Sequence, residues 1–143
     1  MSGIALFLAG APIAYRSRLQ PTVALSSTES EFIAASEAGK LGLYLRHILG
    51  ELSLPPNHAT PLYEDNEAAI ALANSKRPTR RTQHMEILHF ALLDWVETDQ
   101  LLLSAISTHD NPADAMTKAL GPQLFHRHSA TLLGKRKPTY CNF

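Results

Sequence analysis

The chain has one cysteine, no long apolar run and no net charge, and the first two of these shortages each exclude a class of protein. Cys141 is the single cysteine among 143 residues, so no internal disulfide can form and a reducing compartment is favoured. No stretch approaches the ~20 consecutive apolar residues that a membrane span needs. The 13 Lys and Arg residues equal the 13 Asp and Glu residues in number, so total charge neither favours nor excludes a polyanionic partner.

The opening stretch MSGIALFLAGAPIA has the small residues of a signal-peptide cleavage site, but no Lys or Arg precedes its short apolar run. We therefore expect a chain that is neither secreted nor bound to a membrane, located in the cytoplasm or the nucleus. The length suits a single hydrophobic core. We expect one domain over residues 1–134, followed by a basic tail over residues 135–143.

The first half of the chain predicts a hairpin and then a long helix. Apolar runs at 4–9 and 12–16, separated by Gly10 and Ala11, are typical of two strands joined by a tight turn. After Ser26, residues recur at alternating steps of four and three, which places them on one face of a helix of about 25 residues. That face comprises Glu31, Ala35, Ala38, Gly42, Leu45, Leu49 and Leu52, and two prolines at 55 and 56 end the helix.

The second half alternates strands and helices, so the whole chain has an α/β order. The stretch TPLYED (60–65) predicts a short apolar strand that suits the centre of a sheet, and Asn66 is placed to cap the helix after it. The remaining elements are a helix at 85–97, a strand at 101–108, and two helical stretches, NPADAMTKAL and PQLFHRHSATLLG.

Two glutamates near the start of the long helix have different explanations. Ser26 and Glu29 have the spacing of a capping box, in which the Glu29 carboxylate reaches back to the Ser26 amide. Glu31 is two residues further on and heads the apolar face, where a carboxylate is costly unless it is paired, hydrogen-bonded or bound to a cation. We therefore expect Glu29 to cap the helix and Glu31 to need a partner.

Asp65 and Asp114 are also candidate ligands, although each has a structural alternative. Asp65 ends the 60–65 strand and could share the capping of the next helix with Asn66. Asp114 follows Asn111 and Pro112 at a helix start, where the helix dipole alone would favour an acid. If Glu31 joins them, the three carboxylates form the kind of oxygen cluster that binds Mg²⁺ and, with two ions, supports phosphodiester cleavage.

Four stretches, QPTVALSSTESEFIAASEAGK, LYEDNEAAIALA, RRTQHMEI and NPADAMTKAL, resemble in order and spacing the ribonuclease H domain of copia-type retrotransposon Pol polyproteins. The resemblance covers nearly the whole chain. It implies a ribonuclease H-like mixed sheet flanked by helices, and an endonuclease that cuts the RNA strand of RNA–DNA hybrids during reverse transcription with four acids and two Mg²⁺ ions. It also implies that Glu31, Asp65 and Asp114 are catalytic, metal-binding acids, and that the upstream reverse transcriptase region is a partner.

The fourth acid of the family is not found. The resemblance places it on a first, central strand before the hairpin, yet no Asp or Glu precedes Glu29. We therefore expect a chain that lacks this strand, binds Mg²⁺ at most weakly and is inactive alone, with unpaired strand edges that make it unstable or prone to associate. Two alternatives stay open: a non-catalytic remnant that at most binds nucleic acid, and an unrelated α/β protein whose three acids are only helix caps.

A basic loop and two histidines complete the candidates. The loop could bind phosphates or be merely solvated, and its cations are Lys76, Arg77, Arg80 and Arg81. The resemblance raises the importance of Arg81 and His84 without assigning their role. His109 lies five residues before Asp114 and could assist product release or proton transfer, but an ordinary loop position is favoured.

Overall fold

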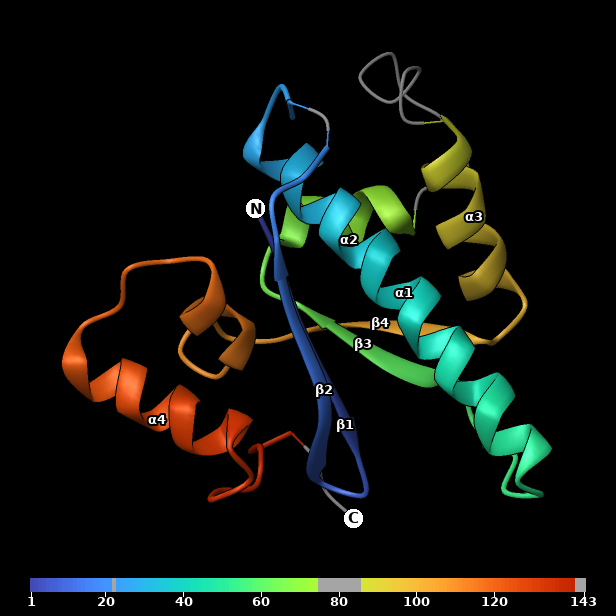
Figure 1. Ribbon diagram of the computed structural model, residues 1–143. Coiled ribbons are helices and arrows are strands. Elements are labelled where there is room, and N and C mark those ends of the chain that lie inside the picture. The colour runs from blue at the N-terminus through green and yellow to red at the C-terminus, as the bar shows by residue number, and fades with distance from the viewer. Residues whose placement is uncertain (22, 75–85, 141–143) are drawn as a thin grey trace. The chain divides into compact units, whose positions relative to one another are not determined.

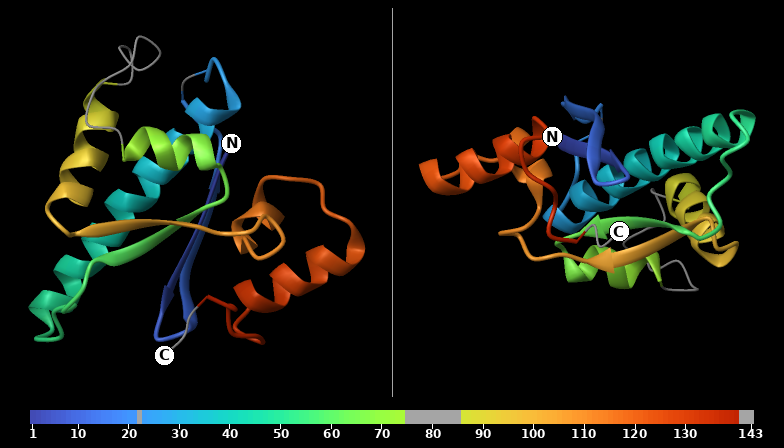
Figure 2. Two further views of the ribbon diagram at one scale, coloured as in Figure 1. Left: turned by 180° about the vertical axis from the view of Figure 1, so that it is seen from behind. Right: turned by 90° about the horizontal axis from the view of Figure 1, so that it is seen from below.

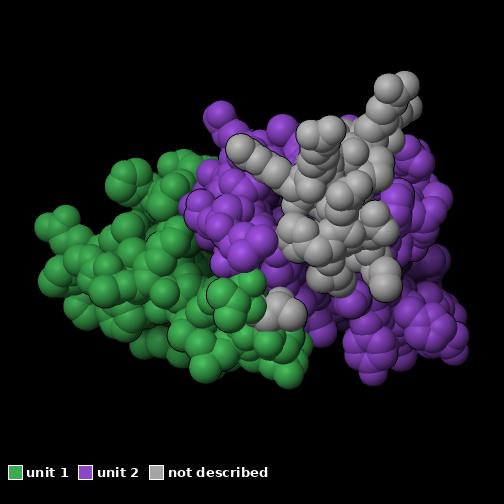
Figure 3. Space-filling view, turned by 90° about the horizontal axis from the view of Figure 1, so that it is seen from above, with its two compact units in different colours: residues 1–23, 106–143 green, residues 24–105 purple. Residues whose placement is uncertain are grey.

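The computed structural model describes residues 1–21, 23–74 and 86–140, and the chain has an α/β fold (Figure 1). It divides into two compact units, which are coloured separately in Figure 3. Unit 1 comprises Met1–Val23 and Ile106–Phe143, and unit 2 comprises Ala24–Ala105. No helix in the described part of the chain is both long enough and apolar enough to cross a membrane.

Unit 1 opens with an antiparallel hairpin of β1 (Ser2–Leu8) and β2 (Ala11–Arg18), which confirms the predicted strands. The turn lies one residue earlier than expected, at Ala9 and Gly10, whose φ angles are 51° and 78°. Both residues are therefore left-handed, as two-residue hairpin turns require. Glycine adopts this conformation without strain, whereas alanine does so at a cost, so the sequence pattern did not point to Ala9.

The helical part of unit 1 consists of a 3₁₀-helix, η2 (Pro112–Met116), and an α-helix, α4 (Pro122–Leu132). Both begin with the expected proline, whose missing N–H costs nothing in the first turn. Asn111 caps η2 as predicted, because its side-chain oxygen accepts a hydrogen bond from the Ala113 N–H at 3.1 Å. These local signals explain where each helix starts.

Close backbone contact holds η2 against the hairpin within unit 1. A Cβ atom on Gly3 would lie 2.7 Å from the Thr117 methyl carbon and 2.8 Å from the Ala113 carbonyl oxygen, so only glycine fits there. The Ser17 hydroxyl also donates a hydrogen bond to the Met116 carbonyl at 2.9 Å. The first and last parts of the sequence are thus joined in one unit.

Unit 2 contains the long helix, a parallel pair of strands and two further helices. The strands pair from Thr60 opposite Leu101 to Glu64 opposite Ala105. Among the described residues each strand of this pair has one strand neighbour, so the chain has two small sheets rather than one continuous mixed sheet. The elements are α1 (Ser27–Glu51), β3 (Thr60–Glu64), α2 (Glu67–Ala73), α3 (Glu86–Glu97) and β4 (Leu101–Ala105).

An apolar core fills unit 2, where α1 packs against β3, α2 and α3 (Figures 1 and 2). Gly39 lets α1 approach closely, because an added Cβ would lie 3.0 Å from Leu101 and 3.2 Å from the Trp95 ring. The buried members of the core are Phe32, Ile33, Ala35, Ala73, Leu92, Leu101 and Leu103.

The predicted apolar face of α1 is buried or half-buried along the helix and becomes exposed only at its C-terminal end. Ala35 and Gly42 are buried as expected, but Leu52 is 64% exposed. The end of α1 extends beyond the two strands of unit 2 (Figure 1), and Leu45 and Leu49 are half-buried rather than buried. At the other end the buried surface is wider than predicted and also includes Phe32 and Ser36.

Candidate acidic site

The two glutamates at the start of α1 have different surroundings, as the sequence predicts. The Ser26 hydroxyl oxygen accepts a hydrogen bond from the Glu29 N–H at 3.1 Å, so Ser26 is the helix cap. The Glu29 carboxylate accepts from the Leu25 N–H at 2.7 Å, one residue before the amide that the capping box predicts. Glu31 is half-buried, as Glu29 is, and differs from it because its charge acts on the buried Glu64 carboxylate of β3.

Asp65 follows the last residue of β3, at the point where the chain turns into α2. The cap of α2 is Asn66, whose side-chain oxygen accepts hydrogen bonds from the Ala68 and Ala69 N–H groups at 3.0 and 3.1 Å. These two bonds satisfy the first amides of the helix. Capping of α2 by Asn66 weakens the interpretation of Asp65 as a helix cap.

Glu64 is a third acid in this region, and it is not among the residues that the sequence patterns predicted. Its side chain is 7% exposed, and one carboxylate oxygen accepts a hydrogen bond from the Asn66 N–H at 3.1 Å. Burial, reinforced by the charges of Glu31 and Asp65, raises the pKa of Glu64 from 4.5 to about 7, although the Asn66 hydrogen bond opposes the shift. The charges of three carboxylates therefore act on one another at this end of β3.

The period of the strand could have revealed Glu64. Side chains two residues apart lie on the same face of a strand, so Glu64 shares a face with Leu62. Leu62 packs against the apolar core of unit 2. An acid on the core-facing side of a strand is costly to ionise, which is itself a signal of a functional site.

Asp114 lies in unit 1, as the third residue of η2 and in its first turn, and is 3% exposed. The Lys118 ammonium group lies 2.9 Å from one oxygen of its carboxylate, four residues further along the chain. Asp114 therefore lies in the first turn of η2, as predicted, and it also forms an ion pair with Lys118 that the sequence did not predict. This pair offsets the cost of burying a charged carboxylate.

His128 is the most buried titratable side chain of α4, with 2% of its surface exposed. Burial, together with the positive charge of Arg127, lowers the pKa of His128, while Asp114 and Asp110 act in the opposite direction. Its Nε2 atom has no hydrogen-bond partner among the residues that the structure describes. His109, in contrast, is exposed, as an ordinary loop residue would be.

The predicted basic loop cannot be placed. Its candidate phosphate-binding residues lie outside the described part of the chain, and they are Lys76, Arg77, Arg80, Arg81 and His84. The structure therefore locates three of the eight predicted site residues. It brings Glu31 and Asp65 together with Glu64 in unit 2 and holds Asp114 in unit 1.

Known proteins match this chain over most of its length, and they include three transposon Pol polyproteins. A "Retrovirus-related Pol polyprotein from transposon TNT 1-94" of Nicotiana tabacum is 36% identical over 119 residues, covering 83% of this chain and 9% of the relative. The Pol polyproteins of transposons RE2 and RE1 of Arabidopsis thaliana are each 27% identical, over 98% and 96% of this chain and 10% and 9% of their own lengths. The homologues of this chain are retrovirus-related Pol polyproteins.

The chain thus corresponds to a retrotransposon Pol polyprotein region, about a tenth of the length of these relatives. No protein-family model matches this Pol region. No solved structure matches it significantly either. The sequence resemblance to retrotransposon Pol polyproteins is therefore confirmed at the level of the polyprotein.

The described acids of this Pol region could supply a hard cation such as Mg²⁺ with two carboxylate ligands, but not with three. In the described residues, no group of three or more His, Cys, Asp and Glu side chains is arranged to hold a metal ion. Mg²⁺, however, commonly takes one or two protein carboxylates and completes its shell with water and phosphate oxygens. Glu31 and Asp65 can supply such a pair, beside a buried Glu64 whose ionisation a nearby cation would favour.

Proposed function

We propose that this chain is the ribonuclease H-like part of a retrotransposon Pol polyprotein, and that its acids take part in Mg²⁺-dependent cleavage of the RNA strand of RNA–DNA hybrids. The homologous Pol polyproteins and the α/β fold support this proposal. The observation that carries it is the effect of the Glu31 and Asp65 charges on the buried Glu64, since carboxylates that repel one another at a strand end are typical of a cation site.

In this proposal Glu31 and Asp65 of unit 2 bind Mg²⁺, and Asp114 of unit 1 has the metal-binding role that the family resemblance implies. When bound, the metal supplies an activated water and stabilises the leaving oxygen of the phosphodiester. Two contacts hold acids of the two units in place: the Asn66 N–H donates a hydrogen bond to the Glu64 carboxylate beside Asp65, and Lys118 pairs with one oxygen of Asp114. RNA–DNA hybrid is the proposed substrate because the 2′-hydroxyl groups of one strand distinguish it from duplex DNA.

A second candidate is a region that binds nucleic acid without cutting it. This chain contains no Asp or Glu before Glu29, so the fourth acid that the family resemblance implies is not among its residues. In the full polyprotein, the upstream reverse transcriptase region is the proposed partner. The two candidates differ in whether joining that region produces cleavage.

A cleavage assay separates them. The chain would be tested alone and joined behind the Pol region that precedes the matching segment in the tobacco relative, on a labelled RNA–DNA hybrid with Mg²⁺. We expect the joined protein to cut the RNA strand, and Asp65→Asn and Glu31→Gln each to slow cleavage at least about 100-fold. Glu51→Gln, an exposed acid on the same helix as Glu31, is the matched control and should cut normally.

Three results would change the proposal. Binding of the hybrid by the joined protein without cleavage would favour the second candidate. If Asp65→Asn alters neither Mg²⁺ binding in calorimetry nor thermal stability, the acidic site is not a metal site. Rapid cleavage by the chain alone would show that the expectation about the fourth acid is wrong.

A further inference from the structure

The neutral net charge of the sequence hides an uneven distribution between the two units. Unit 1 carries seven Lys or Arg residues against two Asp residues, a formal charge of +5. Unit 2 carries six Lys or Arg residues against eleven Asp or Glu residues, a formal charge of −5. Positive charge concentrated in one part of a molecule is the electrostatic signature of a surface that binds phosphates.

Both acids of unit 1 are already engaged by cations of the same unit. Asp110 pairs with Arg127, and Asp114 pairs with Lys118. Of the other five cations, two lie on β2 and three are consecutive in the chain, at positions 135–137 directly after α4. These three residues, called the basic segment here, are Lys135, Arg136 and Lys137, and all are exposed.

The basic segment is anchored at its start by the end of α4. The Lys135 N–H donates a hydrogen bond to the Ala130 carbonyl at 2.8 Å, and Gly134 turns the chain with a φ of 72°. This left-handed glycine and backward hydrogen bond are typical of a helix C-terminus. A Cβ on Gly134 would lie 3.6 Å from the Pro12 ring, so the chain leaves the helix in contact with the hairpin.

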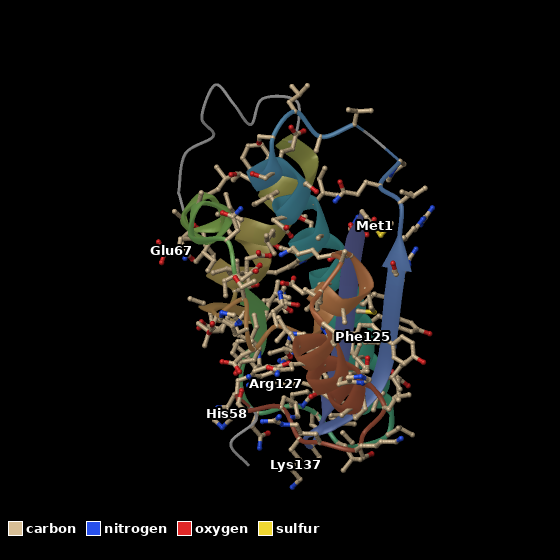
Figure 4. All side chains as sticks on the ribbon, turned by 90° about the vertical axis from the view of Figure 1, so that its left-hand side faces the viewer. Met1, His58, Glu67, Phe125, Arg127 and Lys137 are labelled. Atoms are coloured by element: carbon tan, nitrogen blue, oxygen red, sulfur yellow. The ribbon has the colours of Figure 1, made fainter. Side chains whose placement is uncertain are left out.

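The other end of the basic segment is anchored by apolar contacts. Pro138 is buried, and the Tyr140 ring packs edge-on against Phe7 of β1 at a centroid distance of 6.4 Å. Between the anchors, the Lys137 methylene groups approach Gly10 of the hairpin turn, 3.8 Å from the position of an added Cβ. In Figure 4 the Lys137 side chain points away from the ribbon at the bottom of the drawn chain, and the residue is exposed, so its ammonium group is accessible.

Anchoring matters because a segment that is already ordered loses little conformational entropy on binding. Three adjacent cations held on the hairpin present a fixed cluster of donors, unlike three cations on a loose tail. Such a cluster suits phosphate groups, which attract cations over a distance and release bound counterions. Phosphate contacts orient a nucleic acid without reading its sequence, which suits a nuclease that must act at many sites.

We propose that the basic segment, Lys135, Arg136 and Lys137, is a docking surface for the sugar–phosphate backbone of an RNA–DNA hybrid. The choice of hybrid over other nucleic acids rests on the proposed function. The docking surface itself rests on the charge of unit 1 and on the two anchors. Binding at this surface needs no Mg²⁺, so it can be tested apart from cleavage.

The test is fluorescence anisotropy of the full chain with a labelled RNA–DNA hybrid in EDTA, over a range of salt concentrations. The triple variant K135Q/R136Q/K137Q should bind at least about tenfold more weakly near 0.1 M salt, and the slope of log K against log salt should fall by roughly 2 to 3. Lys137→Gln alone should lower the slope by about 1. Lys40→Gln, which removes an exposed cation from α1, is the control and should change neither quantity.

Two further variants test the anchor while keeping every charge. Tyr140→Ala removes the ring that packs on Phe7 and should weaken binding several-fold, whereas Tyr140→Phe keeps the ring and should bind like the original chain. Circular dichroism melts of each variant would show whether the fold is retained. Equal binding by Tyr140→Ala and the original chain would overturn the role of the anchor.

Other outcomes decide the proposal as a whole. Unchanged affinity and salt slope in the triple variant would overturn it, as would a chain that binds anionic vesicles or acidic peptides but no hybrid. Loss of hybrid binding in the triple variant would support it even if the joined protein never cuts RNA. Cleavage that depends on Asp65, with binding unaffected by the basic segment, would leave the proposed function standing and reject the docking surface.

Discussion

The two units differ in what fills their interiors. Unit 2 has an apolar core in which Phe32 and Leu92 are fully buried. In the described part of unit 1 half of the buried residues are polar, namely Ser2, Asp114, His128 and Thr131. Apolar burial therefore accounts for the stability of unit 2, whereas unit 1 depends on ion pairs, hydrogen bonds and close backbone contacts.

The units also differ in the sign of their charge, and this difference suggests separate tasks. Unit 2 is acidic and carries the carboxylates that suit a cation, Glu31, Glu64 and Asp65. Unit 1 is basic and carries the basic segment that suits phosphate. A phosphodiester hydrolase that uses metal ions needs both kinds of surface.

The largest expected effect is loss of the apolar core of unit 2. Phe32→Ala should destabilise unit 2 by about 3 to 5 kcal/mol, because it removes a fully buried ring and leaves a cavity. Trp95, the only tryptophan, lies beside this core, so its fluorescence in a urea titration reports on unit 2. Leu52→Ala, at the exposed residue that directly follows the same helix, should cost less than about 0.5 kcal/mol.

The pH response of unit 2 gives the second prediction. The pKa of Glu64 is raised to about 7 in the folded state, which means that the folded state favours the protonated carboxyl group. The stability that this preference provides is complete below pH 4.5 and is lost as the pH rises through 7. Glu64→Gln keeps an oxygen for the Asn66 N–H and should stabilise unit 2 by up to roughly 3 kcal/mol at pH 8, with little effect near pH 4.5. Urea titrations at both pH values measure this, and an equal change at both would contradict it.

Unit 1 should be sensitive to added volume rather than to cavities. Gly3→Ala places a Cβ against the Ala113 carbonyl and the Thr117 methyl, and should cost about 1 to 3 kcal/mol. Gly50→Ala is the matched control, because nothing lies within 4 Å of its added Cβ and alanine favours a helix, so it should stabilise by up to about 1 kcal/mol. Amide hydrogen exchange in β1 and α1 would report the two effects separately.

The smallest effect is a pH response of unit 1 opposite in sign to that of unit 2. The pKa of His128 is lowered in the folded state, so below pH 6.5 the unfolded chain takes up the proton first and stability falls with falling pH. His128→Gln should remove this loss. Exchange rates of amides in α4 between pH 5 and 7 would measure it, and a slope unchanged by the substitution would show that His128 is not its source.

Several local features could be predicted because neighbouring residues determine them. The structure agrees with the sequence patterns on the hairpin strands, the capping of α1 by Ser26 and the capping of α2 by Asn66. The turn at Ala9 was misplaced because alanine is strained at a φ of 51°, and no propensity favours it there. Leu52 was misassigned because helical phase says which residues share a face but not where the covering strands end.

The candidate site could be predicted only in part. The positions of Glu31, Asp65 and Asp114 within their elements followed from helix and strand signals. The sequence did not predict the raised pKa of Glu64, because that shift comes from burial. It did not predict the ion pair between Lys118 and Asp114 either, because the position of Asp114 at a helix start was a sufficient explanation. Both features depend on what surrounds a carboxylate in space.

The sequence by itself determined the order and type of the elements, their caps and turns, and the kinship with Pol polyproteins, because these depend on residues close together in the chain. Only the tertiary structure decided that the first and last segments join in one basic unit, and that burial raises the pKa of Glu64 to about 7. The reason is physical: burial and Coulomb interactions act between groups that are neighbours in space, and folding alone selects those neighbours.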